Sequence, residues 1–398
     1  MNIIKNVIII WSCDDFNTLG LLRQLGSAGL TVFFLVDGKA KYASKSKYCL
    51  SYEEMPTKEK GYEYLLGHFS NVKDKPILLT GSDEISIFID QHLDELKSKF
   101  IVQGTIVSGI LEKFTDKNTM CSLANDLGFT CPKTKYVKWN SNISDFIYPC
   151  IIKPSHQKPG HYNEFKYKIC KSEKDLRNIL KYVRHDSEFI LQEYVQKECD
   201  VLVYGARLRD GKTILAGALL RDRLADSGSS SHGLITSKIP LGIDALQIEK
   251  FLSTIDYYGL FSFEYGKVKD KAYFFEVNLR NDGTSDYFNQ SGANIPLAYV
   301  YSCLNLDYSK ICTSVVDEHW FIDEVFDIEN VFHIGGISYK KWKSDFKEAT
   351  VFKYFSSDDI QPYKWVKSHR IRQMLQDFIL KRFRVYVVFV LDKMGLRK

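Results

Sequence analysis

The sequence predicts an α/β protein that opens with a doubly wound parallel sheet, and two observations support this. Apolar runs of strand length alternate with segments of helical periodicity. The runs are 6–11, 31–36 and 76–81, and the helical segments are 16–30, 61–72 and 85–100. Such alternation with uniformly apolar strands is typical of a parallel sheet covered by helices on both faces. After about residue 200 the pattern changes to hairpins, which indicate antiparallel pairing.

The size and composition narrow the classes of protein further. At about 150 residues per domain, a chain of 398 residues is expected to form two or three domains. Hydrophobic residues make up 45% and charged residues 26%, as in soluble globular proteins. A net charge of +5 is small for this length and does not suggest a nucleic-acid partner. The nine cysteines are scattered without a C-x-x-C pair, which disfavours disulfides and zinc and favours a reducing, cytoplasmic location.

The first strand begins in MNIIKNVIIIW and runs directly into Ser12 and Asp14, so this segment is interpreted as a strand and not as a signal peptide. No apolar run approaches the length of a transmembrane segment. Ser82 and Asp83 follow the strand at 76–81, at the carboxyl edge where parallel sheets bind ligands. Asp83 is therefore a candidate substrate-binding residue, although both side chains would also suit the start of the next helix.

A second unit starts near residue 113. A helix is expected at 115–129, opened by Thr115 and closed by Gly128, and a strand is expected after Pro132. Further strands are expected at 148–155, at the start of 167–180 and at 189–195, with a polar loop at 156–166. Ser172 and Asp175 resemble a capping box that opens a helix within 167–180.

Two hairpins follow. The first covers 202–221 and turns at Asp210-Gly211, and a loop rich in serine and glycine lies at 226–233. The second covers 259–280 and brings Glu264 opposite the strand that carries FFEVNLRNDGT.

The stretch FFEVNLRNDGT, residues 274–284, alternates apolar and polar residues. In a strand, alternate side chains share a face, so Phe275 is expected beside Val277. Glu276, Asn278 and Arg280 then share the other face. A carboxylate, an amide and a guanidinium together suit metal and phosphate better than water. The alternative is an edge strand whose polar face meets solvent.

The last segment, 306–398, contains a strand-like run, VFHIGGISY (331–339), and a basic helical stretch from about Trp365. This stretch ends in KRFRVYVVFVLDKMGLRK, where the apolar run VYVVFVL is flanked by Lys381, Arg382, Arg384 and Lys393. Such a pattern suits a helix at a membrane surface or a partner protein. The more common arrangement, a C-terminal helix docked on its own protein, is preferred here.

Polar residues on these predicted elements form a series along the chain. It comprises Lys117, Lys153, Gln192, Glu193, Asp200, Glu264, Glu276, Asn278 and Arg280. Over roughly residues 1–305 this series resembles the ATP-grasp superfamily, in particular its D-aspartate-ligase-like carboxylate–amine ligases. The most specific part of this resemblance is the hairpin with Glu264 and EVNLRNDG, which follows IIKPS and ILQEYV in the sequence.

The resemblance implies a domain plan. An N-terminal pre-ATP-grasp α/β domain would cover 1–112, and a two-lobed ATP-grasp domain would cover 113–305. Its small lobe would span about 113–190 and its large lobe about 191–305. The small C-terminal region, 306–398, has no role assigned by the resemblance.

For the nucleotide, the resemblance implies that Lys153 reaches the phosphates as a compact point charge. Lys117 matches the second phosphate or adenine lysine, although a surface helix lysine would look the same. Gln192, Glu193 and Val195 match the hinge that binds adenine. The ribose ligand would be Asp200, with Glu198 as the alternative.

The loop at 156–166 departs from the family, which closes a glycine-rich flap over the phosphates. Here the loop has the single glycine Gly160, and His156 and His161 would be either substitute donors or ordinary surface residues.

For the metal, the resemblance implies Glu264, Glu276 and Asn278 as ligands of Mg²⁺, with Mn²⁺ as an alternative. Two facing carboxylates repel each other unless a cation lies between them. Arg280 would be the catalytic residue, contacting the transferred phosphoryl group.

For the acceptor substrate, the implied residues are Arg221 and His232, in addition to Asp83. Arg221 and His232 would equally suit a solvated surface.

The activity implied by the resemblance is that of an ATP-dependent ligase. ATP would phosphorylate a small-molecule carboxylate, and an amine would displace phosphate from the acyl phosphate to give an amide, ADP and phosphate. The resemblance allows a homodimer. The alternatives are another ATP-grasp phosphotransferase, such as a carboxylate kinase or a carbamoyl-phosphate-type synthetase, and a non-catalytic nucleotide-binding scaffold.

Overall fold

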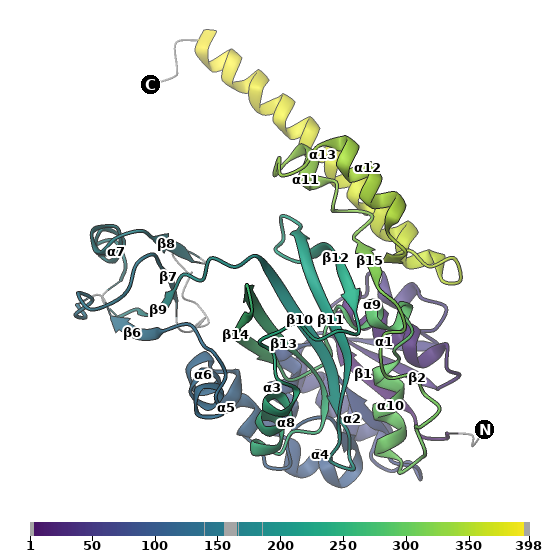
Figure 1. Cartoon of the computed structure of the whole chain (residues 1–398). Coiled ribbons are helices and arrows are strands. Elements are labelled where there is room, and N and C mark those ends of the chain that lie inside the picture. The colour runs from purple at the N-terminus through teal and green to yellow at the C-terminus, as the bar shows by residue number, and fades with distance from the viewer. Residues whose placement is uncertain (1–3, 139, 155–164, 166, 185, 394–398) are drawn as a thin grey trace.

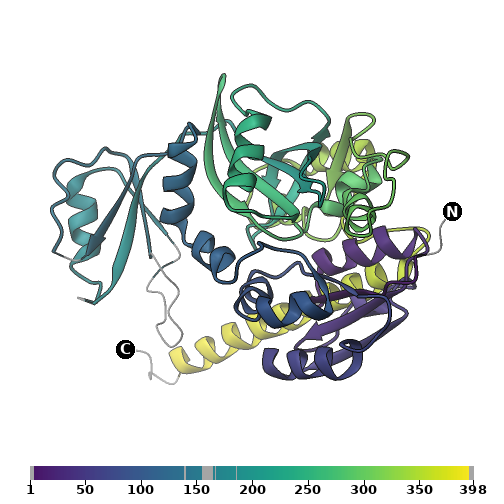
Figure 2. The ribbon, with the colours of Figure 1, turned by 90° about the horizontal axis from the view of Figure 1, so that it is seen from below.

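The computed structural model describes residues 4–393 except 139, 155–164, 166 and 185, and the side chains of the last helix as far as Gln376. These described residues form three sheets: a five-stranded parallel sheet, a four-stranded antiparallel sheet and a seven-stranded mostly antiparallel sheet (Figure 1). In Figures 1 and 2 the four-stranded sheet stands to one side of the seven-stranded sheet, with two helices, α5 and α6, between them.

The N-terminal sheet has the order β3-β2-β1-β4-β5, and all of its pairs are parallel. Its strands are β1 (Ile8–Ser12), β2 (Val32–Asp37), β3 (Ser51–Met55), β4 (Ile77–Leu79) and β5 (Ile101–Val102). Its helices are α1 (Phe16–Gly26), α2 (Lys58–Phe69), α3 (Asp83–Gln91) and α4 (Leu93–Lys99). Ile8 and Ile10 of β1 pack in the cluster with α1, whereas Ile9 and Trp11 pack with α2 and α3. Both faces are covered, which confirms the predicted doubly wound sheet.

The two edge strands of this sheet, β3 and β5, lack the pattern that would predict them from the sequence. β3 is charged and mostly exposed, so it lacks the apolar pattern of a buried strand. β5 is only two residues long. The segment expected as one helix at 85–100 is divided between α3 and α4 at His92.

The four-stranded sheet has the order β6-β9-β7-β8. Its strands are β6 (Thr134–Lys138), β7 (Cys150–Pro154), β8 (Lys168–Cys170) and β9 (Glu188–Glu193), and α7 (Glu173–Leu180) packs beside them. Before the sheet come α5 (Ile110–Thr115) and α6 (Lys117–Asp126). The prediction that Thr115 opens this helix is wrong: Asp116 is the N-cap, and its carboxylate accepts from the backbone N–H groups of Asn118 and Thr119. Ser172 caps α7 as predicted.

The seven-stranded sheet has the order β14-β13-β10-β11-β12-β15-β16. Its strands are β10 (Cys199–Arg207), β11 (Thr213–Leu224), β12 (Ser230–Thr236), β13 (Gly259–Val268), β14 (Lys271–Asn278), β15 (His319–Ile322) and β16 (Val351–Phe352). The helices α8 (Ala245–Thr254), α9 (Ser285–Gln290) and α10 (Ile295–Cys303) pack against it. The hairpin turn at Asp210-Gly211 is confirmed, with Gly211 at φ +89°. The loop expected at 226–233 is shorter, because β12 begins at Ser230.

The alternation expected along β14 fails at Phe275. Glu264 pairs with Glu276, but the next residue, Tyr265, pairs with Phe274, so Phe275 is an extra residue in a β-bulge. Phe274 and Val277 are therefore both buried in the core although they are three residues apart. The prediction that Phe275 shares a face with Val277 is wrong, because the bulge reverses the alternation there.

The C-terminal segment adds β15 and β16 to the large sheet, together with the helices α11 (Glu329–Phe332), α12 (Tyr339–Glu348) and α13 (Ile360–Lys393). The prediction of a strand at 331–339 is wrong. α11 ends here, and both His333 and Ile334 donate their backbone N–H groups to the carbonyl of Glu329. Gly335 then takes φ +77°, which breaks any extended run.

The first turns of α13 dock on the body of the protein, where Trp365 contacts the ring of Tyr42 at 5.6 Å and Arg370 pairs with Glu329. The rest of the helix stands clear of the described chain (Figure 1). The C-terminal helix is therefore docked on its own protein at its first turns, while the side chains of VYVVFVL lie outside those that the structure describes. No helix within the described ranges is both long and apolar enough to cross a membrane.

Candidate functional site

A cleft of about 1480 Å³ lies between the four-stranded sheet, helices α5 and α6, and the bulge of β14. Five residues predicted to bind ATP line it: Lys117, Lys153, Gln192, Glu193 and Val195. Apolar surface comes from Ile151 and Ile169 on the sheet and from Phe275 on the opposite side. Sequence reasoning missed Phe275 as a lining residue because only the bulge turns its ring toward the cleft.

Lys153 extends from β7 into this cleft and is partly buried. Its Nζ donates to Gln192 Oε1 at 3.0 Å, across the pairing of β7 with β9. Burial, reinforced by the charge of Lys117, lowers the pKa of Lys153 to about 8. Two lysines at one end of a cleft repel each other, and an anion between them would relieve this repulsion. The neighbouring residues His156, Gly160 and His161 lie outside the described residues.

The lowered pKa of Lys153 leads to a prediction about pH. A bound polyphosphate favours the charged ammonium, so nucleotide affinity is expected to fall as the pH rises through about 8. Calorimetry in the presence of Mg²⁺ should show the affinity for a non-hydrolysable ATP analogue dropping about tenfold between about pH 7.5 and 9.5. Lys153→Arg should flatten this profile, because arginine stays charged, whereas the exposed control Lys238→Arg should leave it unchanged. An equal drop in the Lys153→Arg variant would contradict a phosphate contact at this position.

The two candidates for the ribose lie at the start of β10: Glu198 directly precedes the strand, and Asp200 is its second residue. The Asp200 carboxylate pairs with the ammonium of Lys197, and the backbone N–H of Glu198 donates to the carbonyl of Lys267. Neither residue lines the cleft, whereas Lys197 does, with its Nζ 5.3 Å from the centre of the Phe275 ring. The ribose ligand therefore stays a prediction.

The three residues predicted to bind a metal come together on the β13–β14 hairpin. Glu264 lies directly opposite Glu276, and Ser262 lies opposite Asn278. Each carboxylate is paired with a cation: Arg221 on β11 donates two hydrogen bonds to Glu264, at 2.7 and 3.2 Å, and Lys117 Nζ lies 3.1 Å from Glu276.

These surroundings affect the two carboxylates differently. Burial raises the pKa of Glu264, against the opposing effect of Arg221. Burial acts to raise the pKa of Glu276 too, but Lys117, Lys153 and Arg280 together lower it. The predicted acceptor residue Arg221 thus lies beside the predicted metal ligands.

Arg280 follows β14 and meets the N-terminal domain. Its Nε and Nη2 donate to the two carboxylate oxygens of Asp83, each at 2.9 Å, and Nη2 also donates to Asn278 Oδ1 at 3.2 Å. Ser82 caps α3, which confirms the helix-start explanation for Ser82. Asp83 contacts Arg280, and its role in binding a substrate stays a prediction.

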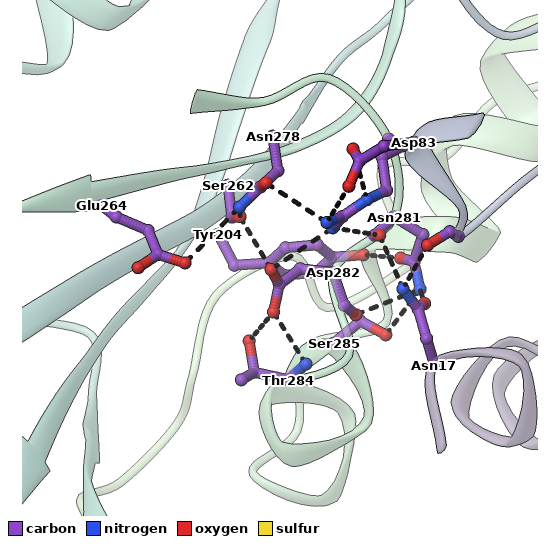
Figure 3. A network of polar contacts seen from close by, with 12 residues as sticks. Asn17, Asp83, Tyr204, Ser262, Glu264, Asn278, Asn281, Asp282, Thr284 and Ser285 are labelled. Atoms are coloured by element: carbon purple, nitrogen blue, oxygen red, sulfur yellow. Dashed lines mark hydrogen bonds and ion pairs between the residues drawn. The ribbon is translucent and has the colours of Figure 1, made fainter. Parts of the chain in front are cut away.

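A buried polar network joins the loop after β14 to the carboxyl edge of the parallel sheet (Figure 3). Asn17 donates to the carbonyls of Gly81 and Asn281, both at 2.9 Å. Asn281 accepts from the Tyr204 hydroxyl at 2.7 Å and donates to Ser285. Asp282 accepts from Ser262 and Thr284. These contacts fix the position of Arg280 relative to the parallel sheet and to the β13–β14 hairpin.

A second cavity, of about 380 Å³, adjoins the hairpin on the side of the N-terminal domain. Arg221, Glu264, Glu276 and Arg280 line one part of it, and Asp15, Phe16, Ser229, Ser230, Asp282 and Lys353 line the rest. Lys353 is 4% exposed, and its Nζ lies 3.0 Å from Asp323 and 4.2 Å from the centre of the Phe16 ring.

Sequence reasoning missed Asp15, Asn17 and Lys353 as site residues. Asp15 and Asn17 follow β1 at the carboxyl edge of the sheet, the same signal that identified Asp83, and it could have found them. Lys353 carries no comparable local signal.

His232 is not brought to this site. It lies buried in β12, where its Nδ1 is 2.8 Å from Asp222 and its ring stacks on Trp320 with centroids 5.0 Å apart. It lines neither of the two cavities described above.

A scan against protein-family models and a sequence search of curated proteins gave no match. Solved structures do match. N5-carboxyaminoimidazole ribonucleotide synthetase from Thermus thermophilus has a TM-score of 0.61 at 14% identity, covering 79% of this chain and 82% of that one. N5-carboxyaminoimidazole synthetase from Staphylococcus aureus, complexed with ADP, has a TM-score of 0.63 at 15% identity, covering 83% and 87%.

L-amino acid ligase from Bacillus licheniformis has a TM-score of 0.59 at 12% identity, covering 80% of each chain. The structural likeness therefore covers most of this chain and most of each matching structure. The matching structures are of two kinds, carboxyaminoimidazole synthetases and an amino acid ligase. At these identities the likeness shows a shared fold: the chain folds like these synthetases and this ligase.

Proposed function

We propose that this protein is an ATP-dependent carboxylate–amine ligase that forms an amide through an acyl phosphate. The observation that carries the proposal is the pairing of Glu264 with Glu276 across β13 and β14, with Arg280 beside them and a lysine-lined cleft next to them. This combination of oxygen ligands, a guanidinium and two ammonium groups suits a reaction that moves a phosphoryl group.

ATP is assigned to the larger cleft. Its apolar walls, Ile151, Ile169 and Phe275, suit an adenine ring, and Lys117 and Lys153 suit the phosphates. The ADP complex of the S. aureus synthetase and an ATP complex of a carboxyaminoimidazole ribonucleotide synthase are consistent with nucleotide binding in this fold.

The hairpin residues fit Mg²⁺. Glu264, Glu276 and Asn278 offer hard oxygen donors on adjacent strands, and nucleotide phosphates commonly supply the remaining ligands of this ion. Glu276 is already favoured in its charged form by the lysines around it. When bound, the ion would neutralise charge on the phosphates.

The smaller cavity is assigned to the carboxylate substrate. Arg221, Arg280 and Lys353 supply positive charge around it. It also reaches Glu264 and Glu276, and Glu276 pairs with Lys117 of the larger cleft. A carboxylate oxygen held there would attack the terminal phosphorus of ATP, and ADP would leave. The amine would then attack the carbonyl carbon and lose a proton as phosphate leaves. Positioning and charge stabilisation would supply most of the rate enhancement.

Hydroxylamine trapping tests this proposal, because hydroxylamine converts an acyl phosphate to a hydroxamate whatever the natural amine is. With ATP, Mg²⁺ and a panel of amino-acid and sugar-acid carboxylates, we expect hydroxamate and ADP in equal amounts for at least one carboxylate. ATP binding without hydroxamate or ADP across the panel would instead favour a non-catalytic scaffold. Amide formation without a trappable intermediate would contradict the proposed order of steps.

A further inference from the structure

The helix α13 extends beyond the body of the protein, and residues 371–393 of this helix are named here the C-terminal arm. Figure 1 shows the arm standing clear of the rest of the described chain. A helix of 34 residues is about 50 Å long, so the arm reaches well past the first, docked turns. The ATP-binding cleft and its neighbouring cavity involve no residue of the arm.

The first part of the arm exposes an apolar stripe. Ile371, Met374 and Leu375 are 50%, 55% and 57% exposed, at the i, i+3, i+4 spacing that places them on one helix face. Helices of globular proteins normally bury such a stripe, so this one lacks the cover that its sequence pattern implies.

Basic residues accompany this apolar surface. Along α13 they are Lys364, Lys367, Arg370, Arg372, Lys381, Arg382, Arg384 and Lys393, while the acidic residues are only Asp377 and Asp392. Over the whole chain, by contrast, 54 Lys and Arg nearly balance 49 Asp and Glu. Positive charge is therefore concentrated on this helix, which favours an anionic partner.

We propose that the C-terminal arm binds the surface of an anionic lipid bilayer. The run VYVVFVL, residues 385–391, makes about two helical turns without a polar break other than its tyrosine hydroxyl. A groove on another protein covers one face of a helix, whereas a bilayer surrounds an inserted segment with apolar material. At about 10 Å in length this run is far shorter than the roughly 30 Å bilayer core, so it would enter the surface of the bilayer without spanning it.

The docked part of the chain holds the arm in place. Asp359, just before α13, accepts from Arg23 Nε of α1 at 3.0 Å and from Ser46 Oγ at 2.7 Å. Trp365 and Arg370 add the contacts with Tyr42 and Glu329. Because the arm continues from an anchored helix, binding to a bilayer would hold the catalytic body at the membrane surface without refolding.

Flotation of the full-length protein with lipid vesicles tests this proposal. Vesicles of phosphatidylcholine with about 30% phosphatidylglycerol should bind the protein at least about tenfold more tightly than pure phosphatidylcholine vesicles, and salt should weaken the binding. Equal binding to both kinds of vesicle, or binding to neither, would overturn the proposal.

Two variants of the arm separate its contributions. Lys381→Glu/Arg382→Glu/Arg384→Glu should lose the preference for anionic lipid, and Val387→Asp/Phe389→Asp should lose binding to both vesicles. The matched control Lys73→Glu/Lys97→Glu/Lys99→Glu makes the same change in charge on the exposed surface of the N-terminal domain and should bind like the wild type.

Equal losses in the control would mean that net charge alone drives binding, which overturns the role of the arm. If vesicles do not bind while the arm variants convert a dimer into a monomer in gel filtration, the arm pairs with a second copy and the lipid proposal is wrong. Hydroxamate formation in solution reports the ligase proposal separately, because the arm lies outside both cavities.

Discussion

Glu276→Gln is expected to reduce ATP-dependent turnover by about 10²–10³-fold, measured as ADP release with an accepted carboxylate. The change keeps the size of the side chain but removes a charge from the face shared by Glu264 and Asn278. A neutral amide would bind Mg²⁺ more weakly, and the phosphates would lose part of their charge compensation.

The fold should survive this substitution. The Glu276 side chain is 34% exposed, and its ion pair with Lys117 resembles exposed pairs that contribute about 0–1 kcal/mol. The thermal midpoint by circular dichroism should therefore stay near that of the wild type. Glu53→Gln, on the exposed face of β3, is the matched control and should keep full turnover. Unfolding of the Glu276 variant at ordinary temperature would mean that this residue is structural, and full turnover would remove it from the site.

The sequence was most informative where local pattern decides the structure. The apolar strands of the first domain, the Asp210-Gly211 turn and the β13–β14 hairpin follow from periodicity and turn chemistry, which act over a few residues. The opposition of Glu264 and Glu276 followed from this hairpin, because the turn between the strands sets the register.

Features that depend on long-range contacts were not predicted from the sequence. The bulge at Phe275 arises from how β14 pairs with β13, and no local signal marks it. Likewise, VFHIGGISY has strand-like apolar residues, but Asn330, just before it, is fixed by contacts with Ser231 and Asp327 that favour the α11 turn. Tertiary contacts outweighed intrinsic preference here.

The residues of the functional site show the same difference between local signals and long-range contacts. Lys117, Lys153 and the hairpin residues were predicted because their order along the chain resembles a family. Lys353 was missed because it reaches the smaller cavity from a segment far along the chain. His232 was assigned to a substrate loop, but the strand pairing of β12 turns it toward Asp222 and Trp320.

Arg280→Lys is expected to leave the affinity for Mg–ATP within about threefold of the wild type and to reduce hydroxamate formation about 10²–10³-fold. Arg280 has N–H donors in a planar fork, and in this structure it uses them for Asp83, Asn278 and the backbone carbonyl of Asn281. An ammonium group cannot hold both oxygens of Asp83 and still present a donor to a phosphoryl group, because its donors radiate from one atom.

The separation between binding and turnover is what identifies the role of Arg280. Calorimetry with a non-hydrolysable ATP analogue measures the first, and single-turnover trapping with hydroxylamine measures the second. Arg177→Lys, on the exposed face of α7, is the matched control and should change neither. If ATP affinity falls as far as the rate does, Arg280 binds the ground state and transition state equally, and its assignment as the catalytic residue is wrong. If neither changes, the contact with Asp83 is structural, because a group that stabilises charge only as the phosphoryl moves must lower the rate when it loses its fork.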